Sequence, residues 1–241
     1  MLTISIVSHN SHVLGECLST LVKITKNIPC EIFVVDNNST IHKPQQDKYP
    51  QVHFILNTKN IGFGRANNQV IGLAQGDFIL VMNPDLLLEK NTIPELVNYL
   101  LRNKHVKIAA PKLLNSNGSV QLSCRKFPTL FTSIGRRLPV LKDRIENEEM
   151  TNFESETTGK VDWASGACLL LRGKQYFDPR YFLYFEDVDL CRTAGEVHYV
   201  PSAQATHLTQ YASRKLSLAL VHHTVSMMKY CRKWGWGKNC K

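Results

Sequence analysis

The fold is decided by a run near the N-terminus, Leu2-Thr3-Ile4-Ser5-Ile6-Val7, in which apolar and hydroxyl-bearing side chains alternate. This alternation and the β-branched content predict a strand. Leucines at helical spacing between Val13 and Ile24 predict a helix, and Glu31-Ile32-Phe33-Val34-Val35 predicts a second strand. Two strands joined through a helix pair in parallel. The opening therefore predicts an α/β fold with a mostly parallel central sheet flanked by helices.

Polar loops follow both of these strands, Ser8-His9-Asn10-Ser11 after the first and Asp36-Asn37-Asn38-Ser39 after the second. In such sheets, ligands bind outside the carboxyl ends of the strands. We therefore expect Asp36 and the Ser8–Ser11 loop to face one crevice. Taken alone, the second loop would be read as an ordinary Asx turn.

A glycine-containing stretch follows the third predicted strand, Val52–Leu56. It reads Asn60-Ile61-Gly62-Phe63-Gly64-Arg65-Ala66-Asn67-Asn68 and leads into a helix that ends at about Ala74. The glycines would let backbone approach a ligand, and Arg65 could meet a phosphate. The stretch is not the dinucleotide-binding fingerprint, because the third glycine is missing and the position in the chain is wrong.

The fourth predicted strand, Phe78–Met82, is followed by Asn83-Pro84-Asp85. Proline cannot continue the ladder, and it restricts Asn83 to extended backbone. Asp85 is then held at the strand's end, in the same crevice as Asp36. A carboxylate there could bind Mg²⁺ or Mn²⁺, which take few protein oxygens and complete their shell with water and phosphates. The alternative is an aspartate that caps a turn.

The rest of the chain shows weaker signals for further elements. In order, these are a capping box at Thr92-Ile93-Pro94-Glu95 opening a helix to Leu101, a strand at Ile108–Pro111, a hairpin turn at Asn117-Gly118, a mobile loop over the crevice at Lys142–Lys160, a strand at Val161–Arg172 interrupted by Gly166, and a strand at Val197–Val200.

The most unusual stretch is Tyr181-Phe182-Leu183-Tyr184-Phe185-Glu186-Asp187-Val188-Asp189-Leu190, where four aromatic residues lead into three carboxylates. Carboxylates beside packed rings lose hydration, and acidic neighbours repel each other. Both effects favour the protonated form, so at least one of the three should have a raised pKa, as a general base or acid requires. The alternative is a helix start, where acidic residues complement the helix dipole.

Two single residues have ambiguous roles. Trp163 could stack on a sugar ring or fill the core. His207 lies beyond the last predicted strand, and a lone histidine is more often structural than a ligand. Its value as a ligand depends on whether it lies opposite Asp85.

The pattern from about Tyr211 to Trp234 predicts a basic amphipathic helix with two apolar sides. One side carries Leu216, Leu220, Met227, Cys231 and Trp234, and the other carries Leu218, Val221, Val225 and Met228. Such a helix suits an anionic membrane surface, and packing on the sheet or on another subunit suits it equally. The chain stops soon after this helix, so the sequence could belong to a longer protein.

Composition narrows the classes of partner. Lys and Arg number 29 against 20 Asp and Glu, which indicates an anionic partner, yet no nucleic-acid-binding motif accompanies the charge. Seven cysteines without a Cys-x-x-Cys pair argue against disulfides and structural zinc, and favour reduced thiols in a cytoplasmic protein. We find no signal peptide at the N-terminus, and no apolar run reaches the ~20 residues that span a bilayer.

Together the motifs resemble glycosyltransferase family 2, and most of all its bacterial rhamnosyltransferase-type members. The resemblance rests on five motifs in order: Ser8-His9-Asn10-Ser11 after its strand, Val35-Asp36-Asn37-Asn38-Ser39, the stretch from Asn60 to Asn68, Asn83-Pro84-Asp85, and the stretch from Phe182 to Arg192. Trp163-Ala164-Ser165-Gly166-Ala167 and His207 also fit. It implies a GT-A fold, a nucleotide-diphosphate sugar donor and inverting transfer.

The resemblance also implies roles for individual residues. Asp187 would be the catalytic base, with Glu186 as a second catalytic residue, and Asp85 with His207 would hold Mg²⁺ or Mn²⁺. Acceptor-binding residues would be Trp163, Gly166 and Glu186. Donor-binding residues would be Ser8, Asn10, Asp36, Asn38, Gly62, Gly64, Arg65, Asn68, Asn83 and Asp85. The chain departs from the family pattern at Asn83, where many relatives carry an acidic residue, and in a short segment at Arg192–Val197.

By the same resemblance, residues 1–110 would form the nucleotide-sugar half, residues 111–207 the acceptor-binding and catalytic half, and residues 208–241 the basic helix. We expect rhamnosyl transfer from dTDP-L-rhamnose to a glycan or lipid-linked acceptor in bacterial surface polysaccharide synthesis, such as O antigen, at the cytoplasmic membrane face. A homodimer is compatible with the terminal helix. Two alternatives are a sugar-nucleotide nucleotidyltransferase, which would want a glycine-rich loop directly after the first strand, and a non-catalytic membrane- or polyanion-binding relative.

Overall fold

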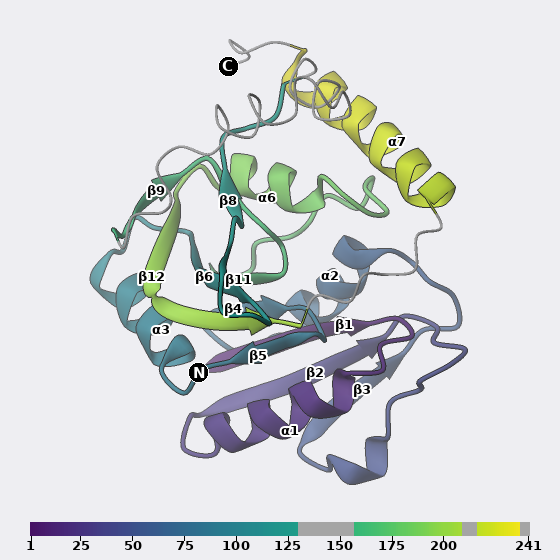
Figure 1. Ribbon diagram of the computed structural model, residues 1–241, viewed down its shortest axis with the longest axis vertical. Coiled ribbons are helices and arrows are strands. Elements are labelled where there is room, and N and C mark those ends of the chain that lie inside the picture. The colour runs from purple at the N-terminus through teal and green to yellow at the C-terminus, as the bar shows by residue number, and fades with distance from the viewer. Residues whose placement is uncertain (130–156, 209–215, 237–241) are drawn as a thin grey trace.

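The computed structural model describes residues 1–129, 157–208 and 216–236, and within them one large sheet carries helices on both faces (Figure 1). The strand order is β3 (Val52–Leu56), β2 (Cys30–Asp36), β1 (Leu2–Ser8), β4 (Phe78–Met82), β11 (Cys168–Arg172), β6 (Ile108–Asn115), β12 (Val197–His207) and β5 (Leu86–Leu88). The short strands β7 (Val120–Gln121) and β9 (Gly159–Val161) pair with β6 and β12. A separate pair joins β8 (Cys124–Arg125) to β10 (Trp163–Ala164).

The first four strands of this order are parallel, as the opening of the sequence predicts. Ser8 is in register with Asp36, and Ile6 is in register with Met82, so β1, β2 and β4 end along one edge. β11 then runs antiparallel to both β4 and β6, while β6 and β12 are parallel. The predicted fold class is confirmed, with several antiparallel pairs in a mostly parallel sheet.

Helices cover the two faces because successive side chains of each strand point in opposite directions. In β4, Leu80 and Met82 join a core that includes α1 (Leu14–Thr25) and α3 (Thr92–Arg102). Ile79 and Val81 join the opposite core, which includes α2 (Phe63–Leu73) and α6 (Glu186–Ala194). A one-turn 3₁₀ helix, η1 (Gln46–Lys48), lies in the connection between β2 and β3.

β12 differs from the expectation that the last strand ends before Pro201. It continues to His207, with a shift in its register against β6 between Val200 and Gln204. The prediction that Thr92 and Glu95 form a capping box at the start of α3 is also wrong. Neither of its side chains caps the helix, because the Thr92 hydroxyl donates to the Gln204 carbonyl and Glu95 Oε2 accepts from Ser202 Oγ at 2.9 Å.

The hairpin predicted at Asn117-Gly118 is confirmed by the pairing of β6 with β7. The predicted loop at Lys142–Lys160 lies outside the described residues, except for its last part, in which Gly159 and Lys160 begin β9.

The C-terminal helix α7 (Leu216–Trp234) packs on the segment around α6, as Figure 1 shows at the C-terminal end of the chain. Met227, Tyr230 and Cys231 are buried there, and Ser226 Oγ donates to the Leu183 carbonyl at 2.8 Å. The second predicted apolar side stays exposed, with Leu218, Val221, Val225 and Met228 on it. Among the described helices, none has the length and apolar character needed to cross a bilayer.

We predict opposite effects for alanine at two glycines, one directly before α2 and one within it. Gly62 has φ +89°, and a Cβ there would overlap the Phe182 carbonyl oxygen, so Gly62→Ala should lower the free energy of unfolding by more than about 2 kcal/mol. Gly72 lies within α2 in open space, so Gly72→Ala should raise it by up to about 1 kcal/mol. Urea unfolding measures both, and equal effects would contradict the close approach at Gly62.

Candidate active site

Two loops at the carboxyl edge of the sheet are fastened to each other. The Asn10 amide donates to Ser39 Oγ at 2.8 Å, and Asp36 Oδ1 accepts from the Ser39 amide at 3.0 Å. Asn10 and Asn38 have φ of 56° and 66°, a region that asparagine tolerates better than most residues. The structure thus brings Asp36 to the loop that follows β1, as the sequence predicts. Ser8 Oγ is buried at this edge and has no hydrogen-bond partner within the described residues.

Asn37 joins these loops to the stretch before α2, a role that the sequence did not reveal. Its Nδ2 donates to Asn60 Oδ1 at 2.8 Å, and its Oδ1 accepts from the Ile61 amide at 3.0 Å and from Asn57 Nδ2 at 3.2 Å. The partners lie 20 to 24 residues further on, so only the folded chain identifies this asparagine as an anchor.

The glycine-containing stretch contacts another part of the chain, the segment from Phe177 to Phe182. The Phe63 amide donates to the Phe182 carbonyl at 3.1 Å, and a Cβ on Gly64 would come within 2.9 Å of Phe177 Cβ. Arg65 Nε donates to the Pro179 carbonyl at 2.6 Å, and Asn68 bonds both backbone groups of Phe177. The small and polar residues here therefore dock the segment that leads into α6. Donor binding by Gly62, Gly64, Arg65 and Asn68 stays a prediction.

Asp85 and His207 lie side by side. This is the arrangement that His207 needs if it is to share a metal ion with Asp85. Pairing of β5 with β12 sets His207 opposite Leu86, and His207 Nε2 is 3.2 Å from Asp85 Oδ1. His207 Nδ1 is 2.9 Å from Gln121 Oε1 on β7. Because that amide oxygen can only accept, it pairs with Nδ1–H, and Nε2 is the nitrogen that would bind a cation held together with Asp85. The sequence alone did not identify Gln121 as a supporting residue.

These two side chains fit a small divalent cation. In an octahedral shell with ligand distances of about 2.0–2.1 Å, neighbouring ligand atoms lie about 3 Å apart. The 3.2 Å separation of the Asp85 oxygen and the His207 nitrogen is close to that value. Gln121 would hold the imidazole in the required tautomer, as outer-shell partners of metal-bound histidines do.

The acidic stretch connects to the end of β4 through the turn at Ser165-Gly166-Ala167. Asp187 Oδ2 accepts from the Gly166 amide at 2.9 Å, and the Ala167 carbonyl accepts from the Asn83 amide at 2.8 Å. A Cβ on Gly166 would lie 3.1 Å from Asp187 Cβ, closer than most neighbours tolerate. The turn thus holds Asp187 and the Asn83-Pro84-Asp85 motif in a fixed relation.

Both residues at the start of α6 have a raised pKa, as the sequence predicts for at least one of the acidic residues. Burial raises the pKa of the Glu186 carboxyl, and the charge of Asp187 raises it further. Burial also raises the pKa of Asp187, and the backbone N–H groups of Gly166 and Val188 oppose that effect. Glu186 Oε2 has no partner among the described residues. The predicted helix start is also present, because α6 begins at Glu186.

The third carboxylate, Asp189, anchors α6 to α7. It accepts from Trp234 Nε1 at 2.7 Å, from Lys233 Nζ at 2.8 Å and from the Tyr181 hydroxyl at 3.2 Å. Asp189 is only 2% exposed, so these donors replace its lost hydration. The three neighbouring carboxylates therefore have different environments, and that of Asp189 gives it a structural role.

Trp163 is half-buried between two apolar clusters, and its Nε1 donates to the Lys126 carbonyl at 2.9 Å. Trp163 is therefore packed as a core residue whose side chain is partly exposed to solvent. Acceptor contact by Trp163 stays a prediction.

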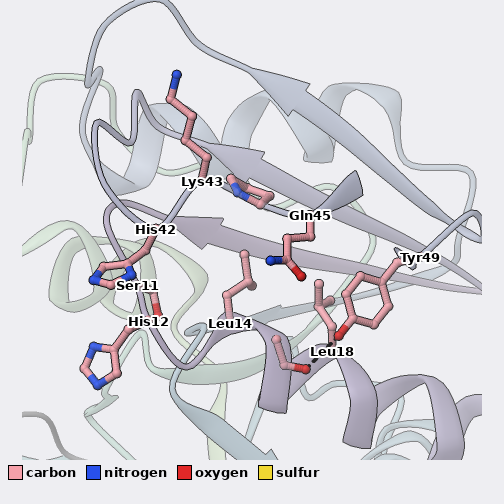
Figure 2. Close-up of a pocket in the computed structure, with 10 residues that line it drawn as sticks. Ser11, His12, Leu14, Leu18, His42, Lys43, Gln45 and Tyr49 are labelled. Atoms are coloured by element: carbon pink, nitrogen blue, oxygen red, sulfur yellow. Dashed lines mark hydrogen bonds between the residues drawn. The ribbon is translucent and has the colours of Figure 1, made fainter. Parts of the chain in front are cut away.

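A cavity of about 200 Å³ lies beside the first loop, between α1 and residues 42–49 (Figure 2). His12 and His42 face each other at one end with ring centroids 5.7 Å apart, and the Tyr49 hydroxyl at the other end donates to the Gly15 carbonyl at 2.9 Å. Ser11 of the loop after β1 lines this cavity, but none of the residues to which the resemblance gives a role does.

Residues 3–145 match the family model described as Glycosyl transferase family 2. The chain belongs to this family. It is 30% identical over 237 residues to the N-acetylglucosaminyl-diphospho-decaprenol L-rhamnosyltransferase of Mycobacterium tuberculosis, covering 86% of this chain and 77% of that one. It is 30% identical over 188 residues to rhamnosyltransferase WbbL of Escherichia coli K12. That match covers 70% of this chain and 69% of WbbL. The family predicted from the motifs is confirmed, and the protein is a glycosyltransferase.

The family's GT-A fold is confirmed by comparison with solved structures. A crystal structure of GalNAc-T7 with UDP, GalNAc and Mn²⁺ superposes with a TM-score of 0.67 at 16% identity. The match covers 100% of this chain and 55% of that one, so this glycosyltransferase spans about half the length of that neighbour. At such low identity, the comparison shows a shared fold only.

We predict that Glu186→Gln changes how the stability of this glycosyltransferase depends on pH. A carboxyl whose pKa is raised by folding binds more protons in the native state, so the wild-type protein loses stability as pH rises from about 4.5 towards the raised pKa. A pKa that is higher by one in the folded state than in the unfolded chain corresponds to about 1.4 kcal/mol. Relative to the wild type, Glu186→Gln should gain on the order of 1 kcal/mol or more between about pH 4.5 and pH 8.

Urea unfolding at several pH values measures this difference. Parallel stability curves for the two proteins would mean that Glu186 ionises in the native state as it does in the unfolded chain.

Proposed function

We propose that this glycosyltransferase transfers a sugar with inversion, L-rhamnose from dTDP-L-rhamnose, to a hydroxyl of a glycan or lipid-linked acceptor in surface polysaccharide synthesis. The observation that carries the proposal is Asp187, a carboxylate with a raised pKa that is joined through residues 165–167 to the motif containing Asp85. The choice of sugar rests on the two relatives named as rhamnosyltransferases. The lipid-linked acceptor rests on the decaprenol in the name of the mycobacterial relative.

Asp187 is the proposed general base. Each of its oxygens accepts one backbone N–H, Oδ2 from Gly166 and Oδ1 from Val188, and each keeps a lone pair for an acceptor hydroxyl. Its raised pKa makes it a stronger proton acceptor than an exposed aspartate. The activated hydroxyl oxygen attacks the anomeric carbon on the side opposite the departing diphosphate, and the proton passes to Asp187.

Glu186 is the proposed partner of the base. Its carboxyl is protonated when Asp187 is ionised, because burial and the neighbouring charge both oppose a second negative charge. A neutral Glu186 can donate a hydrogen bond towards the acceptor, whose other contacts we assign to Trp163 and Gly166.

Asp85 and His207 are the proposed ligands of Mg²⁺ or Mn²⁺. When bound, the ion would neutralise charge on the diphosphate of the donor. The nucleoside of the sugar donor would lie along the edge formed by Ser8, Asn10, Asp36 and Asn38. The buried Ser8 hydroxyl there is available for a hydrogen bond. With Asn83 in place of an acidic residue, the site has one carboxylate fewer than in many relatives.

The test is a transfer assay with labelled dTDP-L-rhamnose, other nucleotide sugars and a panel of acceptors that includes polyprenyl-diphosphate-linked N-acetylglucosamine. We predict transfer from dTDP-L-rhamnose, a fall of about 10²- to 10⁴-fold in turnover for Asp187→Asn, and unchanged donor binding by that variant. Asp77→Asn, at an exposed ion pair with the N-terminus, is the matched control and should keep wild-type turnover.

Transfer only from a different donor would reject the assignment of rhamnose. Full turnover by Asp187→Asn would reject Asp187 as the base, whichever donor is used.

We also propose that α7 makes a peripheral contact with an anionic membrane at its cytoplasmic face. Leu218, Val221, Val225 and Met228 form an exposed apolar stripe, and the helix carries Arg and Lys at its end. Apolar burial combined with basic charge gives affinity for anionic bilayers.

We predict that Val221→Glu with Val225→Glu reduces co-sedimentation with vesicles containing phosphatidylglycerol, because two charges replace apolar contacts at the bilayer surface. Leu101→Glu, at an equally exposed leucine on α3, should bind like the wild type. Unchanged vesicle binding by the double variant would contradict the proposal. A loss of dimers in sedimentation velocity, with no effect on vesicles, would assign the stripe to a second copy of the chain instead.

A further inference from the structure

Three metal-ligating side chains meet at the start of β12, at the end opposite to His207. They are His105, in the connection from α3 to β6, Glu196, directly before β12, and His198, within it. One ligand atom of each lies within 4.8 Å of the others. His198 and His207 are nine positions apart, near opposite ends of β12, and the cluster shares no residue with the pair formed by Asp85 and His207. It is therefore distinct from the candidate active site.

The local fold explains why these three side chains converge. Glu196 and His198 are two positions apart along an extended strand, so their side chains share a face. The amides of Lys107 and Ile108 both donate to the Glu196 carbonyl, at 2.9 and 3.1 Å, which fixes the preceding loop beside it. His105 is thereby brought to His198, and the two rings lie 5.6 Å apart at 74°.

The imidazole of His198 is already arranged as a metal ligand would be. Its Nδ1 is 2.8 Å from the Tyr99 hydroxyl, and its Nε2 faces Glu196 Oε2 at 3.6 Å. Metal-bound histidines typically use the second ring nitrogen in this way, for a hydrogen bond that fixes orientation and tautomer. Burial lowers the pKa of His198, which favours the neutral ring that binds metals.

Glu196 directs its two oxygens to different partners. Lys160 Nζ binds Oε1 at 2.7 Å and lowers the pKa of this carboxyl, so the group is ionised. Its other oxygen, Oε2, is the one that faces His198. Lys160 comes from β9, so β9, β12 and the connection from α3 all contribute to the cluster.

We propose that His105, Glu196 and His198 form a binding site for Zn²⁺ that fastens the α3–β6 connection to β12. Two imidazoles and a carboxylate are a recurrent set of zinc ligands, with water in the fourth position. Ligand atoms of a tetrahedral site with bonds of about 2.0–2.1 Å lie about 3.3 Å apart, so the 3.6 Å between Nε2 and Oε2 needs little adjustment. Imidazole ligands select zinc over the hard cations expected at Asp85. The proposal does not depend on the identity of the sugar donor.

The test uses the full chain without a histidine tag, stripped of metal by a chelator and titrated with ZnCl₂ in a calorimeter, in a buffer containing excess Mg²⁺. His105→Ala and Glu196→Gln change accessible side chains, and each should weaken zinc binding by at least tenfold, since even outer-shell partners contribute about 10- to 100-fold. Tyr99→Phe should weaken it to a smaller extent. Circular dichroism checks that each variant is folded.

Two control variants locate the bound ion. His53→Ala, at an exposed histidine on β3, and His207→Ala, at the candidate active site, should both bind zinc at the His105 cluster with wild-type affinity. With Co²⁺ in place of Zn²⁺, the intense visible absorption of a tetrahedral site should appear in both controls and be absent from His105→Ala. Wild-type zinc affinity in both His105→Ala and Glu196→Gln, or loss of binding in His207→Ala alone, would overturn the proposal.

Discussion

The candidate active site depends on the hydrogen bond from the Gly166 amide to Asp187 Oδ2. A carboxylate withdrawn from water stays available for ionisation only when protein groups replace part of its hydration, and this N–H is one of them. The bond is possible because residue 166 lacks a side chain, since a Cβ there would press on Asp187. The next carbonyl of the turn, Ala167, accepts from Asn83, so the position of the proposed base and the position of the metal motif are set by the same three residues.

The geometry before α6 requires support from α7. Tyr184 and Phe185 both have φ of 67°, a conformation that costs about 1–2 kcal/mol for residues with a side chain. Phe185 is buried against Tyr230 of α7, and Asp189 receives hydrogen bonds from Lys233 and Trp234. Packing of the C-terminal helix therefore offsets the strain that turns the chain into α6. The inner side of the helix packs on the segment that leads into α6, while its outer side leaves an apolar stripe exposed.

Much of this arrangement follows from the sequence because strands and their carboxyl ends are local features. The alternating pattern of β1, the apolar run of β2 and the helix between them were enough to predict that Asp36 lies beside the first loop. The position of His207 was beyond that reasoning, because β12 continues past Pro201 and its register shifts there. Thr92 and Glu95 form a local capping pattern, yet both side chains contact β12 instead, since tertiary partners satisfy them equally well. Asn37 could not be recognised at all, because its partners come from a distant stretch.

The two adjacent carboxyls at the start of α6 differ in a way that supports the roles we propose for them. Asp187 accepts backbone N–H groups on both oxygens, whereas Glu186 Oε2 has no partner within the described residues. Hydrogen bonds to a carboxylate stabilise its charged form, so Asp187 ionises first, and its charge then holds Glu186 in the neutral form. The pair therefore carries one negative charge rather than two over the pH range between the two ionisations. In this state the proposed base can take a proton from an incoming hydroxyl, and the single charge repels the anionic nucleotide-sugar less than two charges would.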